Sequence, residues 1–218
     1  ANETLLGGGG VDGAIHCEAG PELKEECAEL GGCKVGEAKI TRGYRLPASH
    51  VIHTVGPQDQ RESQLEECYS SCLDVLTDNG LKTIAFPCVA TGAYGFPSDR
   101  AAKLVLKTVR FYLESTDPSL IDRIVFCLHS TEDLRAYQQW MPRYFPTSEP
   151  QGVVLRTGQV LPESKELVLK AGLLFDEEGP NGRFWEVRKP VAAPQVDRSE
   201  EHTFELQSPD HIVCRLLL

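Results

Sequence analysis

The stretch Asn2-Glu3-Thr4-Leu5-Leu6-Gly7-Gly8-Gly9-Gly10-Val11-Asp12-Gly13-Ala14-Ile15-His16 decides the fold. Its four consecutive glycines stand between two leucines and the start of an amphipathic helix. Glycine lets successive backbone N–H groups turn inward and approach an anion closely, and the helix that follows adds the positive end of its dipole. The Gly-Lys-Ser/Thr sequence of a P-loop does not follow. On its own, the glycine run is either a flexible linker or an anion-binding loop.

A second glycine loop, Ala90-Thr91-Gly92-Ala93-Tyr94-Gly95-Phe96-Pro97, follows a short apolar segment and precedes a stretch with helical spacing. It therefore has the same strand-to-helix setting as the first loop. Two such loops, at the ends of strands in one sheet, can close on the two phosphates of a diphosphate. Two unrelated tight turns are the alternative interpretation.

Apolar periodicity predicts helices and strands in alternation along the first two thirds of the chain. The expected helices begin at Val11 and cover 22–30, 61–79, 98–113 and 132–141. The expected strands cover 37–41, 51–55, 83–87 and 123–128. This alternation indicates a layered α/β domain that ends near Phe145. A strand should feed the first glycine loop, so we expect the first strands of the domain to be missing from this chain.

We divide the chain into a domain over 1–147, an extension over 148–197 and a tail over 198–218. The extension has short apolar stretches, at 153–155 and 167–169, separated by glycine, proline and charge. It is either a small appended element or a disordered segment. The tail resembles the conceptual translation of a sequencing adapter, with departures at Phe204 and Ile212. Our hypothesis is that the tail is non-native, and in-frame genomic sequence from Arg198 onward would contradict it.

The charge and composition of the chain exclude some classes of partner. A formal net charge of −10 argues against binding nucleic acid through its phosphates, which needs a basic face. A small anionic ligand is still compatible with this charge, because backbone N–H groups at a helix N-terminus can hold a phosphate. No run approaches the roughly 18 apolar residues needed to cross a bilayer. We expect an intracellular protein, cytoplasmic or nuclear, with organelle targeting left open.

The cysteines and histidines do not have the spacing of a metal site. The eight cysteines include no CxxC pair, and we interpret them as reduced thiols, several of them within apolar runs. His50 and His53 stand three residues apart, and in a strand their side chains face opposite sides. We therefore expect neither a metal nor a cofactor.

Several ordered motifs together resemble the MacroD-type macrodomain family. They are the 2–16 stretch, Gly43-Tyr44-Arg45-Leu46-Pro47, Val51-Ile52-His53-Thr54-Val55-Gly56-Pro57, Phe86-Pro87-Cys88 and Thr91-Gly92-Ala93-Tyr94-Gly95-Phe96-Pro97. The resemblance runs from Ala1 to about Phe145. It implies a three-layer α/β/α sandwich with a mixed central sheet, here without its first strands.

The resemblance also implies roles for individual residues. Asn2 matches an asparagine that hydrogen-bonds the ribose near the bond that breaks, and Asp12 matches an aspartate that positions or activates water. His16, one helical turn after Asp12, matches a histidine that accompanies this aspartate. The residues that match the ADP-ribose-binding loops are Gly8, Gly9, Gly10, Val11, Thr91, Gly92, Ala93, Tyr94 and Gly95. Without the resemblance, His16 and Asp12 would read as ordinary helix residues.

The implied function is hydrolysis of mono-ADP-ribose that is ester-linked to Asp or Glu side chains, with possible deacetylation of O-acetyl-ADP-ribose. The expected partners are ADP-ribose, mono-ADP-ribosylated proteins and O-acetyl-ADP-ribose, bound by a monomer. A reader module that binds ADP-ribose without turnover is the first alternative. The Asn2, Asp12 and His16 set favours the enzyme. An inert fragment is the second alternative, which a melting curve with ADP-ribose would test.

Overall fold

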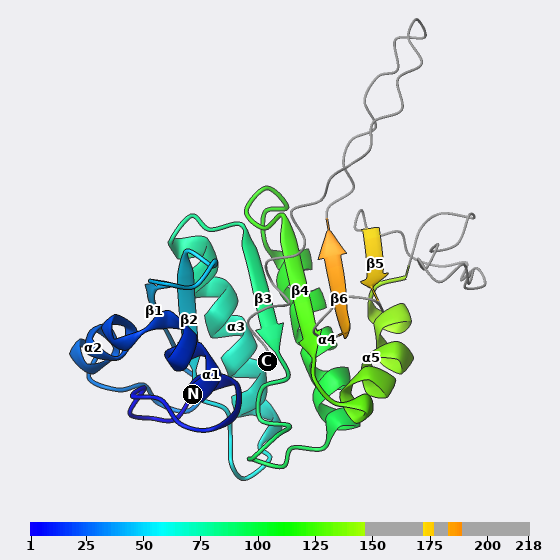
Figure 1. Cartoon of the computed structure of the whole chain (residues 1–218). Coiled ribbons are helices and arrows are strands. Elements are labelled where there is room, and N and C mark those ends of the chain that lie inside the picture. The colour runs from blue at the N-terminus through cyan, green and yellow to red at the C-terminus, as the bar shows by residue number, and fades with distance from the viewer. Residues whose placement is uncertain (147–171, 177–182, 189–218) are drawn as a thin grey trace, which may run out of the picture.

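The computed structural model describes residues 1–146, 172–176 and 183–188 (Figure 1). The helices are α1 (Gly10–Ala19), α2 (Pro21–Glu29), α3 (Glu62–Asp78), α4 (Ser98–Ser115) and α5 (Thr131–Tyr144). The strands are β1 (Ala38–Arg42), β2 (His50–Thr54), β3 (Thr83–Pro87), β4 (Arg123–Leu128), β5 (Gly172–Asp176) and β6 (Arg183–Arg188). The helices and strands predicted from the first two thirds of the sequence are therefore present, with ends shifted by a few residues at most.

The helix ends follow from local sequence. Pro21 occupies the first turn of α2, where its missing N–H costs no helical hydrogen bond. Ser130 caps α5, because its hydroxyl accepts from the Asp133 N–H at 2.9 Å. α4 is amphipathic, and its apolar face is fully buried at positions such as Leu106 and Val109.

The described strands form two separate ladders. β1 and β2 pair antiparallel, with Ile40 opposite Ile52. β3 and β4 pair parallel, with Phe86 opposite Phe126, and β6 pairs antiparallel with both β4 and β5. The order of the second ladder is β3-β4-β6-β5. Parallel and antiparallel pairs both occur, so the predicted α/β fold with a mixed sheet is confirmed.

Two hydrophobic clusters support these ladders. The larger one joins α3, α4 and α5 to β3 and β4, and its fully buried members include Tyr69, Phe126 and Met141. Figure 1 shows α3 and α4 behind the strands of this part of the molecule. The smaller cluster packs α1 and α2 against β2, around Leu23 and Cys27. This second cluster contains Leu5, which precedes the first glycine loop, and Ala19 of α1, so it holds α1 in position.

The region after residue 147 is described only at two strands. β5 and β6 lie inside the predicted extension and add to the sheet at β4, so this part of the extension is strand. The predicted apolar stretches at 153–155 and 167–169 and the predicted tail at 198–218 lie outside the described residues. The division into domain, extension and tail stays a prediction.

Among the described residues, no helix is both long and apolar enough to cross a membrane. The seven cysteines in this part of the chain are free thiols, of which Cys17 is exposed. The interpretation of these cysteines as reduced thiols agrees with this, although Cys17 lies at the surface.

Leu73, a fully buried residue of α3, tests the larger cluster. Leu73→Ala should lower the free energy of unfolding by about 2–5 kcal/mol, because it removes buried methyl groups and leaves a cavity. Phe111, which is 59% exposed on α4, provides the control. Phe111→Ala should change the stability by about 0.5 kcal/mol or less. Urea unfolding of both variants measures the difference, and equal losses would contradict this packing.

Candidate active site

The first glycine loop leads directly into α1 and leaves the helix N-terminus open. Gly9, the N-cap residue, has extended backbone and no side chain that could cap the helix. Gly7 and Gly10 have φ angles of 86° and 62°, which side chains other than glycine rarely adopt. The first N–H groups of α1 are therefore available to an anion, and the helix dipole favours negative charge there.

A close backbone contact holds this loop against α1. The carbonyl oxygen of Gly8 approaches the Cα of Gly13 so closely that a Cβ at Gly13 would overlap that oxygen. Gly13 lies inside α1, where glycine is usually unfavourable relative to alanine. The glycine is therefore needed for the contact with the loop rather than for the helix.

Asn2 shapes the turn that precedes the glycines. Its side-chain oxygen accepts hydrogen bonds from the Thr4 N–H and hydroxyl, at 3.2 and 2.8 Å, and from the Leu5 N–H at 3.2 Å. Its side-chain nitrogen donates to the Gly7 carbonyl at 3.3 Å, which leaves one N–H for another acceptor. Asn2 thus has a structural role, and it still has a donor to offer to a ligand.

Asp12 and His16 lie one turn apart on α1 and face each other, as the sequence predicts. The distance from Asp12 Oδ1 to His16 Nε2 is 3.7 Å, which is too long for a hydrogen bond. The two side chains are only 12% and 10% exposed, respectively. Asp12 Oδ2 and both ring nitrogens of His16 are buried without a hydrogen-bond partner. Buried polar atoms of this kind are rare in folded proteins and call for an explanation, such as a ligand or a catalytic role.

Gly8 lies between two of the three predicted catalytic side chains, those of Asn2 and Asp12. A Cβ built on Gly8 would lie 3.3 Å from both Asn2 Nδ2 and Asp12 Oδ2. The amide and the carboxylate therefore flank the same point of the loop, and a side chain there would crowd both. Asn2 and Asp12 thus lie on either side of Gly8, and His16 faces Asp12, while the catalytic roles of the three residues stay predictions.

A second set of polar side chains, those of His53, Thr41 and Cys27, lies next to His16. The rings of His16 and His53 are 6.1 Å apart between centroids. His53 Nε2 lies 2.8 Å from the Thr41 hydroxyl and 3.6 Å from the sulfur of Cys27. Burial, together with nearby His16 and the N-terminal ammonium, lowers the pKa of His53 to about 4 against a small opposing effect of Glu26. Burial raises the pKa of the Cys27 thiol to about 11, so His53 and Cys27 are uncharged at neutral pH.

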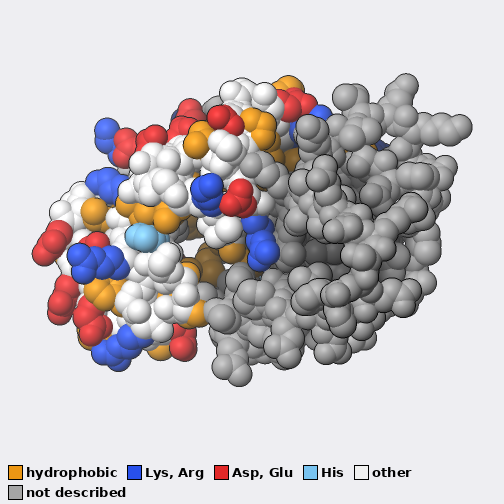
Figure 2. All heavy atoms as spheres, turned by 90° about the horizontal axis from the view of Figure 1, so that it is seen from above, with side chains coloured by type: hydrophobic (Ala, Val, Ile, Leu, Met, Phe, Trp, Pro, Cys, Tyr) orange, Lys and Arg blue, Asp and Glu red, His pale blue; other side chains and the backbone are white. Residues whose placement is uncertain are grey.

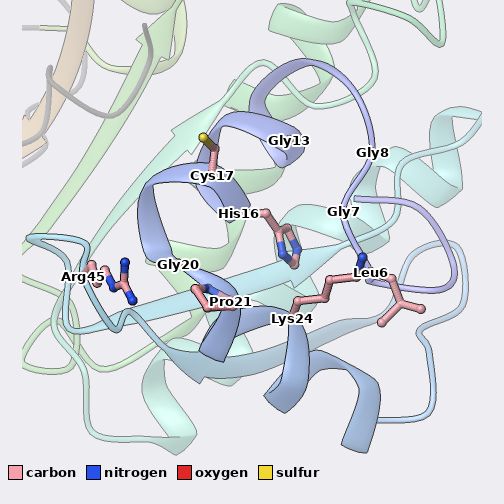
Figure 3. Close-up of a pocket in the computed structure, with 10 residues that line it drawn as sticks. All are labelled: Leu6, Gly7, Gly8, Gly13, His16, Cys17, Gly20, Pro21, Lys24 and Arg45. Atoms are coloured by element: carbon pink, nitrogen blue, oxygen red, sulfur yellow. The ribbon is translucent and has the colours of Figure 1, made fainter.

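A cavity of about 440 Å³ is lined by His16 together with Gly7 and Gly8 of the first glycine loop. Figure 3 shows the His16 ring pointing from α1 into the space beside α2 and the Gly7–Gly8 segment. The other lining residues are Leu6, Gly13, Cys17, Gly20, Pro21, Lys24 and Arg45. Sequence reasoning did not assign Cys17, Lys24 or Arg45 to the site, because only the fold places them there. Arg45 lies within the quoted 43–47 motif, which was the one available signal.

The second glycine loop, Ala90 to Pro97, does not line this cavity. It has its own internal hydrogen bonds, from the Phe96 N–H to the Ala90 carbonyl and from the Thr91 hydroxyl to the Cys88 carbonyl. Figure 1 places it, like the first glycine loop, near the lower edge of the view. The contacts of Thr91, Gly92, Ala93, Tyr94 and Gly95 with a diphosphate stay predictions.

Both glycine loops also contain a non-glycine residue in the left-handed region. Leu5 has a φ of 60° and Ala90 a φ of 66°. Such residues are strained by about 1–3 kcal/mol each and cluster at functional sites. Tyr44 and Gln60, outside these loops, have positive φ angles as well, so this strain is not specific to the loops.

The electrostatics outside the loops are mixed. Basic and acidic side chains are interspersed among the described residues of the face in Figure 2, around a hollow with apolar side chains at its bottom. This distribution does not form the continuous basic stripe that a nucleic-acid backbone needs. The fold and the loops together define an α/β domain with an uncapped helix N-terminus, a feature that suits a small anionic ligand.

Comparison with known proteins identifies the family. The profile of the Macro domain matches residues 1–105. A macro domain-containing protein of Chlorobaculum tepidum is 51% identical over 144 residues, which cover 64% of this chain and 83% of that protein. The chain belongs to the macrodomain family.

A relative named for its activity and a macrodomain crystallised with a ligand are similar over the same region. The ADP-ribose glycohydrolase MACROD1 of Rattus norvegicus is 47% identical over 154 residues, covering 68% of this chain. The crystal structure of the Trypanosoma brucei macrodomain in complex with ADP-ribose has a TM-score of 0.62 and 45% identity, covering 64% of this chain. The chain spans 59% of the rat protein and 60% of the trypanosomal chain.

The Gly8–Gly13 contact can be tested with two substitutions to alanine. In an ordinary helix Gly13→Ala would stabilise the protein by about 1 kcal/mol. Here the new methyl group meets the Gly8 carbonyl, so we expect a net loss of about 1–3 kcal/mol in the free energy of unfolding. Gly9→Ala is the matched control, because a Cβ there meets nothing within 4 Å. Thermal unfolding measures both, and a stabilised Gly13→Ala variant would contradict the contact.

His53 should make the stability of the protein depend on pH. Its pKa is depressed in the folded state, to about 4 from 6.5, so the unfolded chain binds more protons between these values. Stability is therefore fully present above pH 6.5 and falls as the pH drops toward 4, by up to about 3 kcal/mol from this group.

The measurement is urea unfolding at several pH values, in buffer that contains a chelator. Carboxylates also titrate in this range, so the quantity of interest is the difference between the parent and His53→Gln. The variant should have a shallower dependence between pH 6.5 and 4. Parallel curves for the two proteins would mean that His53 does not have this depressed pKa.

Proposed function

We propose that this protein binds ADP-ribose and hydrolyses mono-ADP-ribose that is ester-linked to Asp or Glu side chains. The observation that carries the proposal is the buried, unpartnered Asp12 carboxylate, which faces His16 and lies beside the Asn2 amide. The similarity to a protein named as an ADP-ribose glycohydrolase and to a macrodomain crystallised with ADP-ribose supports it.

The diphosphate of the ligand would lie on the first glycine loop. The uncapped N–H groups at the start of α1 supply donors, and the helix dipole supplies positive potential without a lysine or arginine. Binding through the backbone is compatible with the net charge of −10. The second loop, from Thr91 to Gly95, would close over the other side of the diphosphate.

The asparagine and the aspartate would act on the ribose and on water. Asn2 has one side-chain N–H left after its bond to the Gly7 carbonyl, and this donor can hold a ribose hydroxyl. Asp12 Oδ2 can accept a hydrogen bond from a water and orient its oxygen toward the ester. Hydrolysis breaks one ester C–O bond and adds the hydroxyl and the proton of that water to the two fragments.

This arrangement does not need a covalent nucleophile. The ester to the anomeric carbon is already activated, so positioning and electrostatic stabilisation can supply most of the rate enhancement. The acetyl group of O-acetyl-ADP-ribose is also held by an ester, which the same water could hydrolyse to acetate and ADP-ribose, and we propose it as a second substrate. We also propose that the protein acts as a monomer inside the cell, on mono-ADP-ribosylated proteins.

Release of ADP-ribose from a protein mono-ADP-ribosylated on glutamate tests the proposal. The parent chain should release it, and Asp12→Asn should lower the rate by about 100-fold or more, because the amide cannot accept the proton of water. Asn2→Ala should also lower the rate. Asp59→Asn is the matched control, since Asp59 is exposed and, within the part of the chain that the structure describes, forms its ion pair with Arg61.

Binding of ADP-ribose is measured beside turnover by the rise in melting temperature. A parent that binds ADP-ribose but releases none would contradict the hydrolase and support a non-catalytic reader. Equal rates for the parent and Asp12→Asn would show that Asp12 does not act on the water. A parent with neither binding nor release would contradict the proposal as a whole.

A further inference from the structure

We propose that His16, Cys27 and His53 form a binding site for Zn²⁺. The spacing of these residues in the sequence gives no sign of it, because each comes from a different element: α1, α2 and β2. The fold brings one nitrogen or sulfur atom of each to within 4.8 Å of the others. The proposal does not depend on the proposed hydrolase activity.

The distance between two of the three ligands fits a tetrahedral zinc ion, and the third lies within 4.8 Å of both. The sulfur of Cys27 lies 3.6 Å from His53 Nε2. A zinc ion at about 2.3 Å from sulfur and about 2.0–2.1 Å from nitrogen, with tetrahedral angles, separates these two ligands by about 3.6 Å. The spacing that zinc requires of this pair is therefore already present.

An independent observation at His16 points to a ligand in the same place. Its side chain is 10% exposed, and neither ring nitrogen has a hydrogen-bond partner. Its ring lies next to that of His53 and contributes an atom to the cluster. A buried imidazole without partners is costly, and coordination of a metal would satisfy one of its nitrogens.

The ligand set selects the metal. One thiolate and two imidazoles are soft and intermediate donors, which favour zinc over magnesium or calcium. On binding, the ion would replace the proton of the Cys27 thiol, which leaves to solvent, and would replace the Thr41 hydroxyl as the partner of His53 Nε2. Three protein ligands leave a fourth position for water.

Two negative charges near the site would balance the two positive charges of a buried zinc ion. The Cys27 thiolate contributes one negative charge, and the nearby Asp12 carboxylate contributes a second. Together they offset the two positive charges of the ion, which makes its burial tolerable. Cys27 is fully buried and His53 is 4% exposed, so packing of the smaller hydrophobic cluster holds both ligands in place.

Co²⁺ provides a spectroscopic probe for the test, with the full 218-residue chain. One equivalent of Co²⁺ should give a thiolate-to-cobalt absorption in the near ultraviolet and the visible bands of a tetrahedral ion. Zn²⁺ should remove both signals, and Mg²⁺ should not. Absence of the thiolate band, or bleaching by Mg²⁺, would overturn the proposal.

Variants then locate the site. Cys27→Ser and His53→Gln should bind Co²⁺ about 100-fold more weakly or worse, whereas Cys17→Ser, at an exposed cysteine of α1, should retain the signal. His16→Gln separates loss of metal binding from loss of folding, because it removes no existing hydrogen bond. It should keep the parent's thermal unfolding midpoint and still lose affinity. A full signal in His16→Gln or Cys27→Ser would place the metal elsewhere.

Discussion

The contact between the Gly8 carbonyl and Gly13 is the constraint on which the site depends. It presses the first glycine loop onto α1, so that Asn2, before the glycines, comes next to Asp12, after them. Asn2 and Asp12, which are ten residues apart in the sequence, thereby lie on either side of Gly8. Any side chain at position 13 would separate the loop from the helix, and a side chain at Gly8 would come between the amide and the carboxylate. The glycines thus serve close approach at least as much as flexibility.

The site retains polar groups that the fold alone does not need. A buried carboxylate oxygen and two ring nitrogens without partners lower stability, and replacement by apolar side chains would avoid this loss. The strained backbone at Leu5 and Ala90 acts in the same direction. Proteins keep such features where a ligand completes them. The coincidence of unpartnered Asp12 and His16 with an open helix N-terminus is therefore more informative than any one of them.

Sequence periodicity was enough to predict the helices and strands, because α3 and α4 carry long apolar faces and β3 and β4 are short apolar runs. It also predicted that Asp12 and His16 face each other, since residues four apart share a helix face. It could not predict the cluster behind them. His50 is the histidine nearest to His53 in the sequence, whereas the partners of His53 in the fold are His16, Cys27 and Thr41, from other elements. Likewise, Lys24 and Arg45 enter the cavity wall only through tertiary packing.

His16 connects the two sets of polar residues, and this connection has a physical consequence. At 3.7 Å from Asp12 it forms no hydrogen bond with the carboxylate, so its imidazole is not committed to that side. On its other side lie His53 and Cys27. A water or an ion that binds to the His16 ring from either side fixes the tautomer and the orientation of the ring. The polar residues on the opposite side then face a ring that is already fixed. Binding at one set would therefore change the free energy of binding at the other, and linkage makes such a coupling equal in both directions.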